Sequence, residues 1–285
     1  MMNKILLLTD FSDNATQAIQ YAFKLWQGKP CEFYVLNIQK SSDFTTDDLL
    51  TAKPHESIFT SIIADNKSAL DAYIETLRPL IENEDFTLIP KVDYDVFTDS
   101  VNQVISNYVI DYVVLGTNGV SDARESLFGS NALQVMRKVH CPTLIVPEGF
   151  EFRPLKEVLF TQTQQIKPSP QQLEPVVRLL AGRCSNVHLL GIQPESEPNL
   201  GQLEQGLTQL AEDPFGVLET KAVVESLQGL SVPQAVNAYE QLNEVDLHVF
   251  MVQQESLLSR FLKGSDNGKI SHKTPVPLLV IHAES

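Results

Sequence analysis

The stretch Lys4-Ile-Leu-Leu-Leu-Thr9-Asp10-Phe11-Ser12 decides the fold, because an uninterrupted apolar run is followed at once by polar turn residues. A short continuous apolar run of this kind indicates a strand that is buried on both faces of a parallel sheet. Residues 14–26 then repeat apolar side chains at helical spacing, from Ala15 and Ala18 to Trp26. The chain is therefore expected to open with a β-strand and an amphipathic α-helix.

The same alternation continues through the first half of the chain. Further strands are expected at 33–38, 86–94, 112–115 and 143–146, and further helices at 58–81, 101–108 and 130–138. Pro90, inside the third of these strands, indicates an edge strand or a bulge, because proline cannot donate to a sheet ladder. Regular β–α alternation predicts an α/β fold with a five-stranded, doubly wound parallel sheet.

The second half of the chain repeats parts of the first half in the same order. Residues 4–10 align with 156–162, 35–39 with 189–193, 128–130 with 263–265, and 141–146 with 276–281. Five more strands are accordingly expected near 157–161, 187–192, 217–224, 247–252 and 277–281. We predict two tandem domains, residues 1–147 and 155–285, joined by a linker at 148–154.

Composition favours an ordered globular protein and argues against nucleic acids and anionic membranes as partners, but not against a small anionic ligand held by backbone amides. Hydrophobic residues make up 43% of the chain and charged residues 20%, which is enough for packed cores. A formal net charge of −15 repels nucleic acids and anionic membranes on average. Three separated cysteines indicate a reducing compartment. Because neither a signal-peptide core nor an apolar run of membrane length is visible, we expect a cytoplasmic protein with no nucleic-acid or membrane partner.

A glycine-rich segment follows the fourth strand of the first half. Gly116 and Gly119 lie three positions apart, and Gly129-Ser130 opens a helix after nine further residues. Glycines allow backbone torsions that other residues avoid and a close approach to a ligand. Free amides at a helix N-terminus suit a phosphate group. In open parallel sheets, ligands bind beyond the carboxyl ends of the strands, which points to residues 9–12, 37–39 and 116 onward.

These residues resemble the universal stress protein family, whose nucleotide motif is G-x2-G-x9-G-(S/T). The segment Thr9–Ser12 is similar to the Asp-x-Ser segment after the family's first strand, and 141–147 is similar to its last strand. The resemblance is close over residues 3–147 and loose over 155–282. It implies a tandem member of the family, with two Rossmann-like domains of the adenine-nucleotide α-hydrolase-like type.

The resemblance also implies a ligand and a set of site residues. The first domain alone would bind ATP or a related adenine nucleotide, with Mg²⁺ at the phosphates when ATP is bound. Asp10 would contact the adenosine, Ile38 would line the adenine slot, and Asn131 would add an amide donor. The phosphates and ribose would be held by Gly116, Gly119, Gly129 and Ser130, and Ser12 is counted with the site. Asn118 stands where the family often has a basic residue, and Thr9 where it often has proline.

The second copy departs from this motif. In the alignment, Gln162 stands at the position of Asp10, Val252 at that of Gly116 and Glu255 at that of Gly119, and only Gly264-Ser265 is kept. We therefore expect no nucleotide in the second domain and a structural or regulatory role for it. Family members pair through their last strands, so 143–146 and 278–281 are expected side by side within one chain, where each covers an edge of the other sheet. Association of two chains as a homodimer stays open.

Several alternatives remain at this stage. Asp10 could simply cap the first helix, and the glycines could be ordinary turn residues. The protein could then be an interaction or scaffold protein with a relic site, which Asn118 and the acidic composition favour. An enzyme acting between the domains would need an acid–base set, and no catalytic or metal-binding motif is present. We therefore expect at most slow ATP hydrolysis, within a regulatory role in the stress response.

Overall fold

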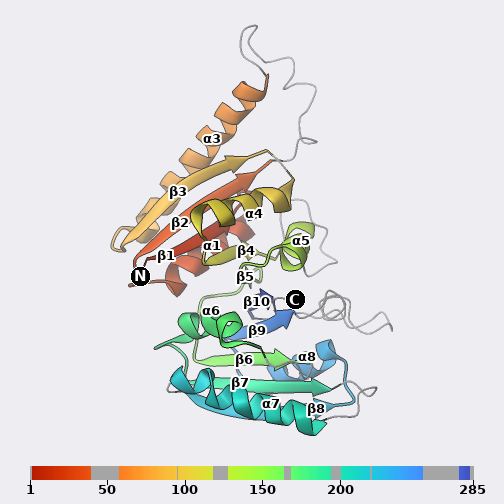
Figure 1. Cartoon of the computed structure of the whole chain (residues 1–285). Coiled ribbons are helices and arrows are strands. Elements are labelled where there is room, and N and C mark those ends of the chain that lie inside the picture. Colours follow the sequence, from red (N-terminus) through yellow and green to blue (C-terminus); the bar gives the residue numbers. More distant parts are fainter. Residues whose placement is uncertain are drawn as a thin grey trace.

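The strands of the molecule form one continuous sheet. The computed structural model describes residues 2–39, 58–94, 96–117, 128–163, 168–193, 200–218, 220–252 and 276–282. Their strands build a ten-stranded sheet in the order β3-β2-β1-β4-β5-β10-β9-β6-β7-β8. In Figure 1 the N-terminal half lies above the C-terminal half, with β5 and β10 between them. The strands run parallel within each half, and alternate with helices, which confirms the predicted α/β fold.

The N-terminal half follows the expected alternation closely. Its strands are β1 (Asn3–Leu8), β2 (Cys31–Ile38), β3 (Phe86–Asp93), β4 (Tyr112–Gly116) and β5 (Thr143–Val146). Its helices are α1 (Asp13–Leu25), α3 (Ile58–Leu77), α4 (Phe97–Tyr108) and α5 (Ser130–Lys138), with a 3-10 turn at Arg78–Ile81. β3 lies at the edge of the sheet, as Pro90 indicated. α4 begins at Phe97 rather than Val101, because the carbonyl of Val96 already accepts the amides of Asp99 and Ser100.

The C-terminal half repeats the same order of elements. Its strands are β6 (Glu157–Gln162), β7 (Asn186–Gln193), β8 (Lys221–Gln228), β9 (Leu247–Val252) and β10 (Leu278–His282). Its helices are α6 (Pro170–Leu180), α7 (Leu200–Glu212) and α8 (Val232–Leu242). The strand expected at 217–224 was wrong at its start. Phe215–Leu218 instead form a 3-10 turn that packs the ring of Phe215 on Phe160, with the ring centroids 5.5 Å apart.

A continuous apolar core joins the two halves on both faces of the sheet. β5 and β10 pair in antiparallel register, with Leu144 opposite Leu279 and Ile145 opposite Leu278. All four side chains are buried. Leu144 and Leu279 belong to one apolar cluster, and Ile145 and Leu278 belong to the cluster on the other face. Separating the halves would expose this surface to water, at a cost of roughly 25 cal/mol for each Å² of apolar area.

Hydrogen bonds fix how the first strands of the two halves correspond. The amide of Asp111 donates to the carbonyl of Lys4 at 2.8 Å, and the amide of Asp246 donates to that of Glu157 at 2.8 Å. The two aspartates precede β4 and β9 and are equivalent, so Lys4 corresponds to Glu157. The alignment of Lys4 with Lys156 was therefore wrong by one residue.

This shift changes the residues that stand at the positions of the motif. Asp10 corresponds to Thr163 and not to Gln162. On the fourth strand, Gly116 pairs with Val146, and Met251 pairs with Ile281 at the equivalent place, so Gly116 corresponds to Met251 and not to Val252. Uninterrupted apolar runs allow such a slip in a sequence comparison. The hydrogen-bonded pairing of the strands does not allow this one-residue shift, because the shift would move every side chain of the strand to the other face of the sheet.

Candidate functional site

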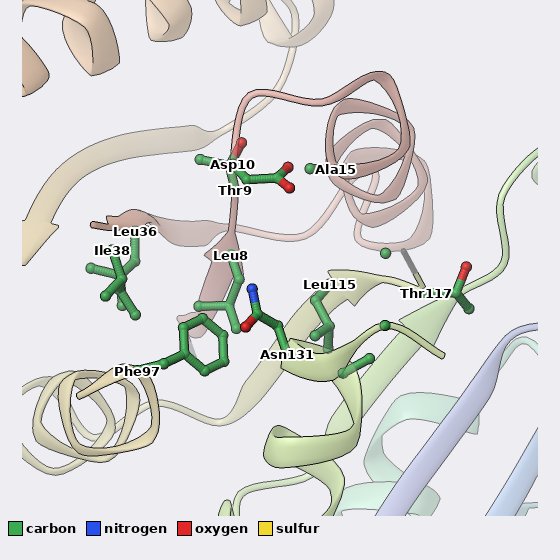
Figure 2. Close-up of a pocket in the computed structure, with 13 residues that line it drawn as sticks. Leu8, Thr9, Asp10, Ala15, Leu36, Ile38, Phe97, Leu115, Thr117 and Asn131 are labelled. Atoms are coloured by element: carbon green, nitrogen blue, oxygen red, sulfur yellow. The ribbon is translucent and has the colours of Figure 1, made fainter. Parts of the chain in front are cut away.

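A pocket opens at the carboxyl ends of β1, β2 and β4, beside the start of α5 (Figure 2). Its enclosed part has a volume of about 60 Å³, and the volume is about 500 Å³ when the open space in front is included. Five of the expected site residues line it together: Asp10, Ile38, Gly116, Gly129 and Asn131. The remaining walls are Leu8, Thr9, Ala15, Leu36, Phe97, Leu115, Thr117 and Ala132.

The other expected site residues either do not line this pocket or lie outside the described part of the chain. Ser12 caps α1, and Ser130 is exposed at the first position of α5; neither lines the pocket. Gly119 lies outside the described residues, as does Asn118. The same holds for the second-copy residues Glu255, Gly264 and Ser265.

Asp10 orders the turn between β1 and α1. Its Oδ1 atom accepts the hydroxyl of Ser12 at 2.6 Å and the amide of Ser12 at 3.1 Å. Ser12 Oγ in turn accepts the amide of Ala15 at 3.1 Å, so Ser12 and not Asp10 is the N-cap of α1. Between them, Phe11 has a φ of 65°, a conformation uncommon for residues other than glycine. Asp10 thus both lines the pocket and holds the cap in place.

Gly116 is required for space and not for an unusual torsion. It is not among the described glycines with positive φ. A Cβ atom at this position would lie 2.8 Å from Nδ2 and 3.0 Å from Oδ1 of Asn14, a side chain that is buried at the start of α1. Gly116 therefore lets α1 pack closely on the end of β4, which corrects the expectation that the glycine serves backbone freedom.

The start of α5 offers uncapped amides beside the pocket. Gly129 is the N-cap residue and provides no side-chain cap. Its own amide donates to the carbonyl of Thr117 at 2.6 Å, so this amide is already used. The first amides of a helix lack acceptors within the helix and suit an anion, and Asn131, the second residue of α5, lies at the pocket.

Two pocket features could not be read from the motif. The Oδ1 atom of Asn131 is buried and has no hydrogen-bond partner within the described residues. Figure 2 shows its side chain beside the ring of Phe97, the first residue of α4. Phe97 follows β3, and only the ends of β1, β2 and β4 had been considered. The rule that ligands bind beyond strand ends, applied to β3 as well, would have found it.

Comparison with known proteins identifies the family. The family model described as "Universal stress protein family" matches residues 1–147. The chain belongs to the universal stress protein family. Universal stress protein Slr1230 of Synechocystis is 24% identical over 313 residues, which covers 98% of this chain and 99% of the relative. This full-length match supports a tandem member of the family.

Solved structures show the same fold. A universal stress protein from Archaeoglobus fulgidus covers 99% of this chain and 97% of its own, with 17% identity and a TM-score of 0.66. A universal stress protein solved in complex with cAMP covers 50% of this chain and 96% of its own, with 19% identity and a TM-score of 0.32, which is too distant to carry a ligand over. Within the described ranges, no helix of this universal stress protein combines the length and apolar character needed to cross a bilayer.

The cysteines and acidic groups offer little chemistry of their own. Burial raises the pKa of Cys31, Cys141 and Cys184 to about 12 each, so the reactive thiolate is disfavoured at neutral pH. The described residues include no group of three or more His, Cys, Asp or Glu side chains placed to hold a metal ion.

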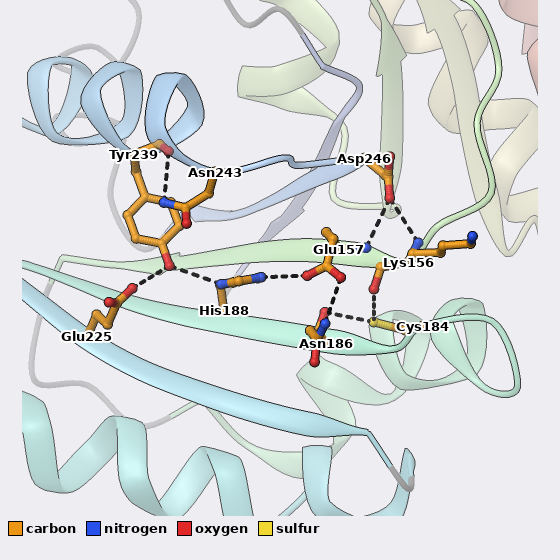
Figure 3. Close-up of polar contacts among 9 residues, drawn as sticks. All are labelled: Lys156, Glu157, Cys184, Asn186, His188, Glu225, Tyr239, Asn243 and Asp246. Carbon is orange, nitrogen blue, oxygen red and sulfur yellow. Dashed lines mark hydrogen bonds and ion pairs between the residues drawn. The ribbon is translucent and has the colours of Figure 1, made fainter.

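A row of hydrogen-bonded side chains in the C-terminal half holds helix α8 on the sheet (Figure 3). His188 contacts Glu157 at 2.8 Å through Nε2 and the hydroxyl of Tyr239 at 3.0 Å through Nδ1. The Tyr239 hydroxyl also donates to Glu225. This row links β6, β7 and β8 to α8 on one face of the sheet. Because Glu157 begins β6, it lies away from the carboxyl ends where ligands bind, and we assign it to holding α8 on the sheet.

Proposed function

We propose that this universal stress protein binds ATP or a related adenine nucleotide in its N-terminal half and acts as a cytoplasmic regulator in the stress response. The observation that supports this is the convergence of Asp10, Ile38, Gly116, Gly129 and Asn131 on one pocket. These residues come from three strand ends and one helix start, at the place where open parallel sheets bind ligands.

Each wall of the pocket has a proposed part in binding. The apolar side chains and the ring of Phe97 receive the adenine, and Asn131 Oδ1 accepts a hydrogen bond from its amino group or from a ribose hydroxyl. Asp10 contacts the ribose. The first amides of α5, with Ser130 and Gly119, hold the phosphates, and Mg²⁺ accompanies the phosphates of ATP. Among the described pocket residues the one carboxylate is that of Asp10, which we assign to the ribose, and we expect hydrolysis to be slow at most.

We further propose that residues 1–147 and 155–285 act as two domains joined by 148–154. Only the first would take a nucleotide, because Thr163 and Met251 stand at the positions of Asp10 and Gly116. Met251 is buried at this place and has a long side chain where Gly116 has none. The C-terminal domain then serves as the built-in partner of the first, through β5 and β10. A ligand that changes the shape of the N-terminal pocket would affect the second domain through the packing of this shared core.

Calorimetric titration of ATP, ADP and AMP into the full chain, with and without Mg²⁺, tests the proposal. Asn131→Leu is the sharpest variant, because it removes an acceptor that has no described partner and is not expected to lower stability. We expect it to weaken nucleotide binding by about tenfold, the loss of one good hydrogen bond. Thr163→Ala, at the position equivalent to Asp10, is the matched control. Equal affinity in the wild type and in Asn131→Leu contradicts this site.

A scaffold role with a relic pocket is the second candidate. Two observations favour it: the enclosed volume is about 60 Å³, well below the roughly 300 Å³ of common ligand sites, and the Gly129 amide is already bonded to Thr117. Nucleotide binding therefore has to use the open space in front of the pocket. If wild-type protein gives neither heat nor a thermal shift with any of the three nucleotides, the scaffold role is the better account.

A further inference from the structure

A second cavity lies between the two halves, at the opposite ends of the strands from the first pocket. It has a volume of about 220 Å³. Asn3 and Tyr112, which begin β1 and β4, form its wall in the N-terminal half with Trp26 and Lys29. The C-terminal half contributes Arg178, Leu179 and Arg183, from α6 and the turn after it. Figure 1 shows α6 on the side of the C-terminal half that faces the N-terminal half.

Two cations face this cavity without an acidic partner. Lys29 and Arg183 each follow a glycine with positive φ, Gly28 after α1 and Gly182 after α6. Among the described residues neither forms an ion pair, and the Nη1 atom of Arg183 is buried with no hydrogen-bond partner. The two helix C-termini offset part of this charge, because their carbonyl ends carry a partial negative charge.

The third cation of the cavity is already neutralised. Arg178 Nη2 donates to Asp111 Oδ1 at 2.8 Å, and Asp111 Oδ2 accepts the amide of Lys4 at 2.8 Å. Both oxygens of this carboxylate already have a partner, and no ion pair joins it to Lys29 or Arg183 among the described residues. The guanidinium of Arg178 also lies over the ring of Tyr112, 5.3 Å from its centroid, which fixes it as a wall of the cavity.

The arrangement of these two cations favours an anion between them. Burial, together with the nearby guanidinium of Arg183, lowers the pKa of Lys29, and burial lowers that of Arg183. Two like charges held together and partly removed from water repel each other, whereas a doubly charged anion between them would turn this repulsion into attraction. In a protein of net charge −15, two clustered cations have little effect on the overall charge, so we assign them a role within the cavity itself.

We propose that this cavity binds a phosphate group, through Lys29 and the free face of Arg183. Guanidinium and ammonium groups are the side chains that bind phosphate oxygens most strongly. The cavity exceeds the space of one oxyanion, and the tilted rings of Trp26 and Tyr112, with centroids 5.4 Å apart, give it an aromatic wall. The two rings are 2% and 1% exposed, so they close the cavity and offer little free ring face. The ligand is inorganic phosphate or a small phosphate monoester whose organic part fits the remaining space. Because both halves contribute, binding strengthens their association.

Trp26 allows the cavity to be observed directly, because it is the single tryptophan of the chain. Inorganic phosphate and phenyl phosphate are titrated separately into the full chain at constant ionic strength, and the fluorescence of Trp26 is recorded. We expect a saturable change with both probes. Tighter binding of phenyl phosphate identifies a monoester site, and equal binding identifies a site for the free ion.

Charge-removing variants decide whether the cavity is the binding site. Arg183→Gln and Lys29→Gln should each weaken binding by about tenfold or more, the loss of one charge-assisted contact. Lys24→Gln removes an exposed charge from α1 and should leave the affinity unchanged, and Asn131→Leu should do the same because it alters the other pocket. Lys29 lies in a surface turn, so its variant keeps the test valid if Arg183→Gln does not fold. The proposal is overturned by the absence of a saturable change in the wild type, by equal affinities in all variants, or by equal weakening in Lys24→Gln.

Discussion

The carboxyl ends of the two half-sheets have the same topology and different surfaces. At the end of β2, Asn37 Nδ2 donates to the carbonyl of Thr9 at 2.9 Å and ties two strand ends together beside the pocket. Gly191 takes the position of Asn37 in the C-terminal half. A Cβ atom on Gly191 would lie 2.8 Å from Leu207 and 2.9 Å from Leu203, so α7 packs directly on the strand. The comparison teaches that strand order places a site, and that a few side chains at the strand ends decide whether it is open.

The two halves also differ in their cores, where the C-terminal half has polar residues at positions that are apolar in the N-terminal half. In the C-terminal half, His248 Nδ1 lies 3.4 Å from Glu240 Oε1, and the two side chains are 0% and 2% exposed. The equivalent residues of the N-terminal half are Val113 and Ile105, which are apolar and pack in the same cluster. At these two equivalent positions the N-terminal half therefore has apolar side chains, and the C-terminal half has a buried polar pair.

The largest expected effect comes from breaking this buried pair. Glu240→Ala should lower the free energy of unfolding by about 3–5 kcal/mol, because it leaves His248 in the core without its carboxylate. The double variant Glu240→Ile with His248→Val copies the N-terminal half and should be neutral or more stable than wild type. Urea denaturation measures both. If the double variant is as unstable as Glu240→Ala, the loss of stability does not come from leaving His248 without its carboxylate, and the prediction is wrong.

The next effect depends on pH at the junction between the halves. His282 of β10 stacks on His140 with ring centroids 4.8 Å apart, and burial, aided by the charge of His140, lowers its pKa from 6.5 to about 4. The unfolded chain then binds more protons than the folded chain between these pH values. Stability should therefore fall by about 3 kcal/mol as the pH decreases from about 6.5 to about 4.

His282→Phe tests this dependence, because it keeps the stacking on His140 and removes the titrating group. Its stability should stay nearly level across the same pH window, as followed by thermal unfolding at half-unit steps. A wild type and a variant that lose stability in parallel would assign the acid sensitivity to other groups.

A matched pair of glycine substitutions sharpens the comparison of the strand ends. Gly116→Ala and Gly191→Ala should each cost ~1–3 kcal/mol, because each added Cβ meets a packed side chain at 2.8 Å. Only Gly116→Ala should also weaken ATP binding, since Gly116 lines the proposed nucleotide pocket and Gly191 does not. Loss of ATP binding in both variants would show that a general loss of stability, and not a change in the pocket, lowers the affinity for ATP.

The helix caps give the smallest expected effect. Ser12 caps α1 and Ser169 caps α6, so alanine at either position should lower the free energy of unfolding by about 1 kcal/mol. Ser12→Ala also releases Asp10, whose Oδ1 accepts the Ser12 hydroxyl, and should weaken ATP binding as well. Ser169→Ala should not. Identical ATP titrations for the two variants would remove Asp10 from the proposed site.

Much of the fold followed from local patterns. The apolar run before Asp10 and the helical spacing of residues 14–26 predicted β1 and α1, because burial on one or two faces leaves a periodic signal in the chain. The rule on strand ends led to Asp10, Ile38 and Gly116. The strand expected at 217–224 was wrong at its start, because the apolar residues Val217 and Leu218 belong to a 3-10 turn and β8 begins only at Lys221.

Other features could not be predicted in this way. The space that Gly116 leaves for Asn14, the buried acceptor of Asn131 and the position of Phe97 depend on how separate elements pack. The register between β1 and β4 depends on hydrogen bonds between strands about a hundred residues apart, and an apolar run matches equally well when shifted by one.

The sequence by itself determined the α/β alternation and the repeat of the strand order in the second half, because both follow from the order and spacing of nearby residues. The tertiary structure alone decided which residues of the halves correspond, and it brought Lys29 and Arg183 to one cavity. The reason is physical: periodicity records whether a residue is buried, whereas the partner of a buried or charged group is chosen only when distant segments pack together.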